Sequence, residues 1–308
     1  MATRHTYASV DDLRDYLAGT SYSSNWSSDS AIMTRIVEAS SVRIDNYMGM
    51  QSFGPRSETR YYDIGSGSLR RSTQNIRNST GGNIIGPSSA MVNAVPLDRW
   101  LVSVTGTITS YKSTDRAESE SLDEGYNNDY WLLPYNTSPK VEIELNEDTS
   151  KGFHGGQQTL ADTGVWGYSN DLSGEKTTTG TIATETETAW GVEDASTLNT
   201  AQTIKVDDEQ MYITGISSNT LTVERGVNGT TAATHTAGTS VYTYVYPTLV
   251  VQACLDLSKI YFRDRDLGVT QTIGTPEMGV TRSDREAINI LKTLDTYRAT
   301  TTESQVFF

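Results

Sequence analysis

Hydrophobic residues recur at helical spacing near both ends of the chain and at strand spacing between them. Near the start, Ser9 followed by Asp12 forms a capping-box pattern, which predicts a short helix that ends at Gly19. A second helix is expected from Ser28 to just before Gly49, because its apolar residues recur every three or four positions. Those residues are Ile32, Met33, Ile36, Val37, Ile44, Tyr47 and Met48. Each helix therefore has one apolar stripe to bury.

Two further helices are predicted near the end of the chain. Pro247 begins the first one. Its apolar stripe contains Leu249, Val250, Ala253, Cys254, Leu257, Ile260 and Tyr261. Ser283 and Glu286 form another capping-box pattern, which begins a last helix that reaches Arg298. Because Cys254 belongs to the apolar stripe, we expect a buried small side chain and not a nucleophile.

Short alternating runs separated by Gly, Asn and Ser predict β-strands through the middle of the chain, from 56 to 246. The clearest pair is 211–216 and 220–225, which predicts a hairpin around the three-residue turn 217–219. Residues 141–145 alternate cleanly, so one face of that strand is expected to contact solvent.

The apolar stripes at the two ends of the chain can be buried most simply against each other. We therefore expect an α+β fold, in which a discontinuous helical bundle from the two chain ends carries inserted antiparallel β domains. The expected domains are a helical core from 1–55 and 247–298, a β-rich domain at 56–173, an inserted β module at 174–246, and a C-terminal tail at 299–308.

Charge and composition limit the possible functions. The formal net charge is −14, and residues 101–200 alone contain 17 acidic but only 5 basic side chains. The chain offers no basic stripe that could hold DNA phosphates. A single cysteine excludes an intrachain disulfide and a multi-cysteine zinc site, and three scattered histidines give no histidine-rich metal centre. No apolar run has the length of a membrane helix, and the N-terminus has no apolar segment of the kind found in signal peptides, so we expect neither a membrane helix nor a signal peptide.

None of the common catalytic patterns fits the sequence. Residues 226–231 resemble part of a phosphate loop but have no lysine and no following helix. The acids at 207–209 do not have the spacing of an EF-hand, so we expect them to be solvated, and we expect His235 to be exposed and inert. A polysaccharide hydrolase that uses acids from 118–148 is conceivable, but no positioned carboxylate pair is evident. We therefore expect no catalytic residue, no cofactor, no metal and no enzyme activity.

A series of short motifs lies in a definite order between and within the predicted terminal helices. They are Pro96-Leu97 before Val102-Ser103-Val104, then Asp129-Tyr130, 165–168, Tyr246-Pro247, Gln252-Ala253, 261–265 and 294–298. In this order, and together with the terminal helices, they resemble the head-tail connector, or adaptor, proteins of tailed double-stranded DNA phages. Residues 203–235 are similar to a β module that is commonly inserted in phage virion proteins and is missing from the shorter connectors.

This resemblance implies a structural protein of the virion neck, assembled in the host cytoplasm. It implies a homo-oligomeric ring, usually a dodecamer, that docks beneath the portal protein. The ring would join the portal to the tail or to the next neck protein, a tail terminator or head-tail stopper. Double-stranded DNA would pass through its central channel without specific binding, and no membrane partner is implied.

Two groups of residues are candidates for contacts in such an assembly. By analogy with the family, the tail reaches the portal through Gln305, Val306, Phe307 and Phe308. Burial of the two Phe side chains is worth roughly 2 kcal/mol each; the alternative is a frayed tail without a docking role. Arg263 and Arg265 end the best-defined helix, where they either satisfy the helix dipole or pair with acids of a neighbouring subunit.

A different function remains open on the sequence alone. The Thr-rich and Gly-rich strands are also typical of a tail-fibre or receptor-binding β protein of the virion. Such a protein is expected to be a trimer without a terminal helix pair, so the oligomeric state would distinguish it from a ring connector.

Overall fold

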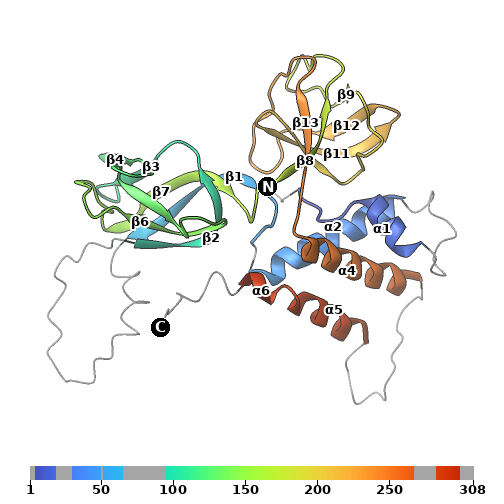
Figure 1. Ribbon diagram of the computed structural model, residues 1–308, viewed down its shortest axis with the longest axis horizontal. Helices are drawn as coiled ribbons and strands as arrows, with labels where there is room; N and C mark the ends of the chain where they lie inside the picture. The colour runs from blue at the N-terminus through green and yellow to red at the C-terminus, as the bar shows by residue number, and fades with distance from the viewer. Residues whose placement is uncertain (1–3, 19–29, 50, 65–93, 267–281, 299–308) are drawn as a thin grey trace. The chain divides into compact units, whose positions relative to one another are not determined.

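The computed structural model describes residues 4–18, 30–49, 51–64, 94–266 and 282–298 (Figure 1). The chain divides into two compact units, which are considered one at a time. Unit 1 consists of Met1–Arg56 and Ser169–Phe308, and unit 2 consists of Ser57–Tyr168. Unit 2 is therefore continuous in sequence, whereas unit 1 is assembled from both ends of the chain.

Unit 2 contains a seven-stranded sheet with the order β4-β3-β7-β2-β6-β5, in which β1 also pairs with β7. Its strands are β1 (Arg56–Ile64), β2 (Ala94–Val104), β3 (Ile108–Tyr111), β4 (Ser119–Leu122), β5 (Tyr130–Leu133), β6 (Lys140–Leu145) and β7 (Gly156–Trp166). Every pair along this order is antiparallel. The predicted alternation in β6 is confirmed, because Ile143 and Leu145 are buried whereas Glu142 and Glu144 are not.

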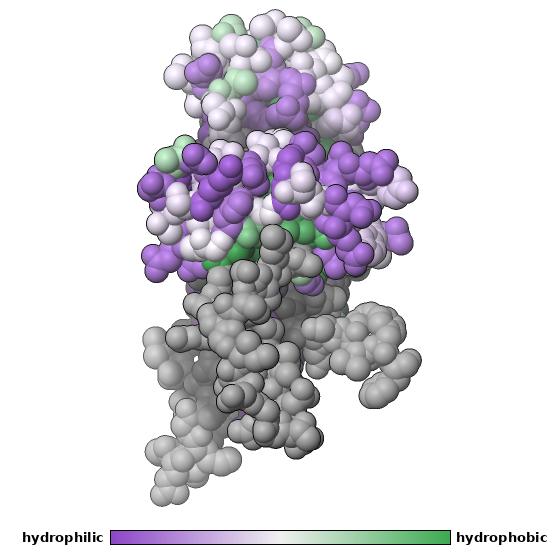
Figure 2. All heavy atoms as spheres, turned by 90° about the vertical axis from the view of Figure 1, so that its left-hand side faces the viewer, coloured by the Kyte–Doolittle hydropathy of each residue, from purple (hydrophilic) through white to green (hydrophobic). Residues whose placement is uncertain are grey.

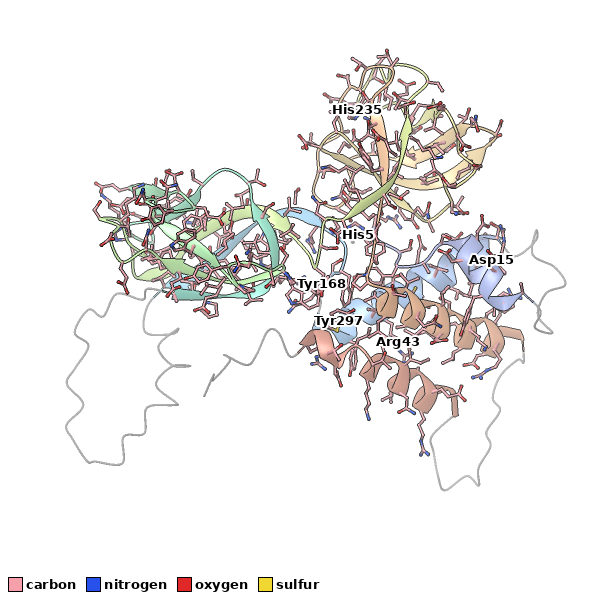
Figure 3. The ribbon with its side chains drawn as sticks, in the orientation of Figure 1. His5, Asp15, Arg43, Tyr168, His235 and Tyr297 are labelled. Atoms are coloured by element: carbon pink, nitrogen blue, oxygen red, sulfur yellow. The ribbon has the colours of Figure 1, made fainter. Side chains whose placement is uncertain are left out.

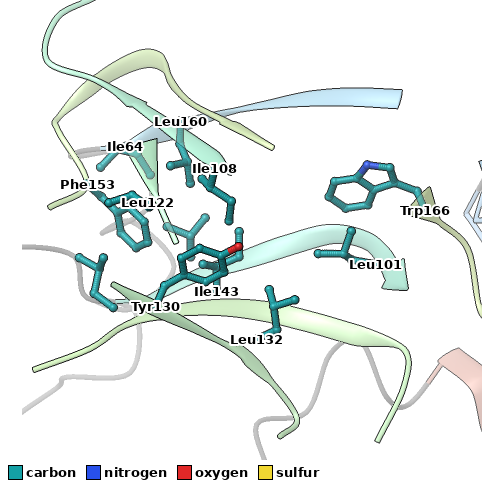
Figure 4. Packing of buried hydrophobic residues seen from close by; sticks show 12 residues of the cluster. Ile64, Leu101, Ile108, Leu122, Tyr130, Leu132, Ile143, Phe153, Leu160 and Trp166 are labelled. Atoms are coloured by element: carbon teal, nitrogen blue, oxygen red, sulfur yellow. The ribbon is translucent and has the colours of Figure 1, made fainter. Parts of the chain in front are cut away.

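The core of unit 2 is built from the inward-facing residues of these strands (Figure 4). Leu132 of β5 lies opposite Ile143 of β6, so each strand supplies an apolar side chain to the same layer. Trp166 at the end of β7 is 1% exposed, and its indole Nε1 donates to the carbonyl of Glu58 at 3.1 Å. This bond satisfies the one polar atom of the ring inside the core.

Unit 1 contains a second antiparallel sheet of six strands, with the order β8-β13-β10-β11-β12-β9. Its strands are β8 (Leu172–Thr177), β9 (Ala189–Gly191), β10 (Thr203–Val206), β11 (Glu209–Ser217), β12 (Thr220–Glu224) and β13 (Ser240–Tyr244). The predicted hairpin is confirmed as β11 and β12. Its turn is shorter than predicted, because Ser217 already pairs with Thr220 and Ser218 adopts a φ of 54°.

The helices of unit 1 come from both chain ends. They are α1 (Val10–Leu17), α2 (Ser30–Tyr47), α4 (Thr248–Asp266), α5 (Arg282–Lys292) and α6 (Asp295–Arg298). The predicted capping box is confirmed: the Ser9 side chain accepts from the Asp12 backbone N–H, and the Asp12 carboxylate accepts from the Ser9 N–H. Helix α4 packs against α1, α2 and α5. The predicted start of the second helix at Ser28 lies outside the described residues.

The expected fold class is wrong. Two antiparallel sheets, of seven and six strands, make up most of the molecule, and the helices are few and short in comparison. The molecule is therefore not a helical bundle with β insertions. Most residues of the predicted stripes of α2 and α4 are buried, although Leu249 is exposed. The helices also contact more than each other: the Tyr212 hydroxyl of β11 in the second sheet donates to Glu38 of α2 at 2.6 Å. The sheet expected as a separate module, 174–246, belongs to the same compact unit as the helices.

The described residues on the face shown in Figure 2 are mainly hydrophilic, and few hydrophobic side chains reach this surface. None of the described helices combines the length and the apolar character that a membrane crossing requires.

Candidate functional site

The interface between α2 and α4 is the place where the two ends of the chain meet. Small polar side chains line its buried part: Ser40 and Ser258 hydroxyls lie 2.9 Å apart, and the Ser41 hydroxyl lies 3.5 Å from the Cys254 sulfur. Cys254 is fully buried, as the sequence predicted, and burial raises the pKa of its thiol to about 11. Small side chains let the two helices approach closely, so this interface fixes α2 against α4.

Longer polar side chains hold the same helices together at the rim of this interface. Arg43 of α2 donates to the Tyr261 hydroxyl of α4 at 2.8 Å. The Tyr16 hydroxyl of α1 donates to Asp256 of α4. Tyr47 at the end of α2 donates to Asp295, at the start of α6, at 2.6 Å. Contacts from α1, α2, α4 and α6 thus join residues separated by more than two hundred positions into one helical layer.

Residues 4–9, which we call the N-terminal segment, lie between the helices and the second sheet of unit 1. The Asn228 side chain accepts from the Arg4 N–H at 2.7 Å, and the Thr203 hydroxyl donates to the Arg4 carbonyl. On the helical side, the Tyr7 N–H donates to the Ser41 hydroxyl at 3.1 Å. The N-terminal segment therefore connects sheet and helices inside unit 1.

His5 is the titratable group at the centre of this connection (Figure 3). Its Nε2 lies 2.7 Å from the Pro55 carbonyl, and its Nδ1 lies 3.0 Å from the Tyr246 hydroxyl. Because a carbonyl can only accept, Nε2 carries the proton and Nδ1 accepts from the tyrosine. Burial is the largest cause that lowers the pKa of His5 to about 4, so the ring is neutral at physiological pH.

A buried charged cluster lies within the second sheet, and the sequence interpretation missed it. Glu209 of β11 accepts from Arg225 and from the backbone N–H groups of Gly226 and Ala233, at 2.9 and 3.0 Å. His235 lies between two carboxylates, with Nε2 2.9 Å from Glu209 and Nδ1 2.8 Å from Asp207. The expectations that the acids at 207–209 are all solvated and that His235 is exposed are therefore wrong for Glu209 and His235, which are 1% and 3% exposed.

The signal for this cluster was the two-residue spacing that places Glu209, Met211 and Ile213 on one face of β11. Met211 and Ile213 face the core of the second sheet. Glu209 precedes them by two and by four residues, and residues at this spacing in a strand share a face, so Glu209 must face the core as well. Only an internal partner makes such burial tolerable, and Arg225 supplies it. Arg225 also donates to the backbone carbonyls of Thr184, Glu187 and Ala233, so this cluster is suited to fixing the loops around it.

The predicted interface arginines at the end of α4 both have partners within the chain. Arg263 Nη1 donates to Glu286 of α5 at 3.1 Å, and its Nε lies 3.4 Å from Asp264. Arg265 is exposed, and its guanidinium carbon lies 4.6 Å from the centre of the Phe262 ring. Arg263 thus helps to hold α5 against α4, and a contact between subunits stays a prediction for both residues.

The predicted portal-docking residues Gln305, Val306, Phe307 and Phe308 lie outside the described residues, so their role also stays a prediction. Among the residues that the structure describes, no three or more His, Cys, Asp or Glu side chains are grouped so that they could hold a metal ion.

The comparisons with known proteins found no relative of this chain. No protein-family model matches the chain. Neither the curated proteins nor the solved structures gave a match.

Proposed function

We propose that this chain is a structural protein of the neck of a tailed phage. In this role it forms a homo-oligomeric ring that joins the portal protein to the tail terminator, or to the head-tail stopper. The double-stranded genome passes through the central channel of the ring. The protein is assembled in the host cytoplasm and remains in the virion.

The observation that carries this proposal is the contact between α2 and α4. The resemblance to connectors rests on motifs from both ends of the chain, and it would have no physical basis if those ends lay apart. Instead, Ser40 meets Ser258, and Arg43 meets Tyr261, across the interface of the two helices. In the proposed ring, the unit that contains this helical layer and the second sheet repeats around an axis, with complementary patches between neighbouring copies.

The charge of the chain is compatible with a DNA channel. With 38 acidic against 24 basic residues, the protein offers little for phosphates to hold. The repulsion between acidic side chains and DNA decays within about 8 Å at physiological salt, so DNA can pass without being trapped.

A tail-fibre or receptor-binding protein is the second candidate, and the dominance of antiparallel sheets favours it. The packing of α4 on α1 and α2 speaks against it, because a fibre protein is not expected to have a terminal helix pair.

Native mass spectrometry and electron microscopy of the full chain, alone and with the portal protein of the same virion, test the proposal. A closed ring, expected to be a dodecamer, that binds the portal is the predicted result. A stable monomer with the portal present would overturn the proposal. A trimer would instead support the tail-fibre or receptor-binding function.

A further inference from the structure

Unit 2 has a surface cavity of about 470 Å³ that none of the roles above uses. It lies between the loop that precedes β5, residues 123–129, and the loop that follows β6, residues 146–150. Its lining includes Tyr126, Asn127, Asp129, Trp131, Asp148 and Ser150. The volume is in the range of small-molecule sites, and the lining combines aromatic with uncharged and acidic polar groups.

Hydrogen bonds fix the two loops that form the cavity. Asp129 is 8% exposed, and its carboxylate accepts from the Thr149 hydroxyl at 2.7 Å and from Lys151 Nζ at 2.8 Å. The Asn146 side chain donates to the Asn128 carbonyl at 3.1 Å, which joins one loop to the other. A ligand therefore meets a site that is already ordered, and little conformational entropy is lost when it binds.

Aromatic side chains border this cavity and remain open to solvent. Tyr126 is 81% exposed, an unusual value for so large a side chain. Trp131 is half-buried, and its ring is held edge-on against Tyr135, with 5.9 Å between the centroids and an angle of 88°. Flat aromatic faces can cover the C–H face of a ligand ring, because the electron-rich face attracts partly positive hydrogens.

The polar groups at the rim are available to a ligand. Among the described residues, the side chains of Asn127, Asp148 and Ser150 make no hydrogen bond. Asn127 sits at a φ of 65°, at the tip of its loop. Amide, carboxylate and hydroxyl groups together offer both donors and acceptors, which suits a ligand rich in hydroxyl groups. The residues that line the cavity in the described chain include no Lys or Arg, and Asp148 repels anions.

We propose that this cavity binds a neutral saccharide, with a sugar ring against Tyr126 or Trp131 and its hydroxyl groups on Asn127 and Asp148. The proposal is independent of the neck function, because saccharide binding and ring formation are measured separately. A ring that binds no saccharide would overturn only this proposal, and a saccharide-binding protein that forms no ring would overturn only the neck function.

Isothermal titration of the full chain with maltohexaose, cellohexaose and chitohexaose tests this site. Trigalacturonate serves as the anionic probe, and a lysine hexapeptide as the cationic one. The informative variant is Tyr126→Ala, because this side chain is too exposed to support the fold. Tyr61→Ala is its matched control, since Tyr61 is an exposed tyrosine of the same unit that does not line the cavity.

We expect saturable binding of at least one neutral oligosaccharide, weakened about tenfold or more by Tyr126→Ala and unchanged by Tyr61→Ala. Asp148→Ala should weaken the same binding. The proposal is overturned if none of the three binds at about 10 mM, or if Tyr126→Ala leaves binding unchanged. Tighter binding of trigalacturonate or of the lysine peptide would also overturn it, and would assign the cavity to an anion or to a basic peptide.

Discussion

The carboxylate of Glu209 accepts from both Nε and Nη2 of Arg225, at 2.7 and 2.8 Å, and these side chains are only 1% and 5% exposed. Such a pair needs both partners, because a single buried charge has neither water nor a counter-charge. We expect Glu209→Gln to lower the free energy of unfolding by about 3 kcal/mol or more, measured by urea denaturation. The exposed neighbour provides the control: Asp208→Asn should change stability by less than about 0.5 kcal/mol. Equal effects of the two variants would contradict the structural role of the cluster.

The second prediction concerns acid and His5. Burial lowers the pKa of this ring to about 4, against 6.5 in the unfolded chain. Between these values the unfolded chain binds a proton that the folded chain does not, so stability falls as the pH falls from about 6.5 to about 4. The full loss is up to about 3 kcal/mol. In pH-dependent denaturation, His5→Gln should remove this loss whereas His154→Gln should keep it; the same pH profile for both variants would refute the assignment.

The third prediction concerns Asp162, a fully buried residue of β7. Neither of its carboxylate oxygens has a hydrogen-bond partner among the described residues, and burial, with a smaller effect of Glu124, raises its pKa to about 7. The folded chain therefore binds a proton between about pH 4 and pH 7 that the unfolded chain releases. Stability from this group is present below pH 4 and is lost as the pH rises to 7, by up to about 4 kcal/mol.

Asp162→Asn should consequently slow hydrogen exchange in β7 at pH 8 and have little effect near pH 4, after correction for the intrinsic exchange rate. The exposed Asp148→Asn is the control in the same unit and should alter neither measurement. An Asn variant that exchanges faster at pH 8 would show that the charged carboxylate has a partner in solution.

The fourth prediction separates two roles of Arg263. In the chain it pairs with Glu286 at 3.1 Å. Arg263→Glu alone should weaken the contact of α5 with α4 and impair ring assembly, whichever role is correct. The double exchange Arg263→Glu with Glu286→Arg restores the internal pair but reverses the charge that a neighbouring subunit would meet. Native mass spectrometry should show that the double variant still fails to assemble; recovery of the ring would assign Arg263 to the internal pair alone.

The fifth prediction concerns the end of the chain. Deletion of Val306, Phe307 and Phe308 should leave the ring intact and weaken its binding to the portal protein, because each subunit loses two Phe side chains worth roughly 2 kcal/mol each when buried. Surface plasmon resonance with immobilised portal measures this change. Replacement of the same residues by Val-Leu-Leu is the control, which should retain most of the binding. Unchanged binding after deletion would remove the docking role.

Local features of the fold could be predicted from the sequence because they depend on neighbouring residues. Ser9 and Asp12 specify a helix start without help from the rest of the chain, and the position of Cys254 on an apolar stripe was sufficient to predict its burial. The fold class could not be obtained in this way. An apolar stripe shows that a helix needs a partner, but not that β11 would share in covering α2 through Tyr212 and Glu38.

The burial of two carboxylates was also not predicted from the sequence, and for both the reason is the same. Glu209 and Asp162 both belong to strands, where the side chain direction follows from register and not from residue type. A carboxylate in such a position looks like a solvated acid until the strand is placed. In β11 the apolar Met211 and Ile213 share a face with Glu209, whereas the same-face neighbours of Asp162 are Leu160 and Gly164, of which only Leu160 has an apolar side chain. The cavity beside Tyr126 was likewise not predicted, because it forms only when the pairing of β5 with β6 brings the loops 123–129 and 146–150 together.

The N-terminal segment also determines the order in which the chain can mature on the ribosome. Arg4 is held by Asn228 and Thr203, and its neighbours contact helices that close only when α4 has been synthesised. Unit 2, which is continuous, can complete its sheet while the ribosome is still translating the second half of the message. The N-terminal segment can therefore be fixed only after residues 203 and 228 have been synthesised, and a nascent chain truncated before 203 would leave Arg4 without both of these partners.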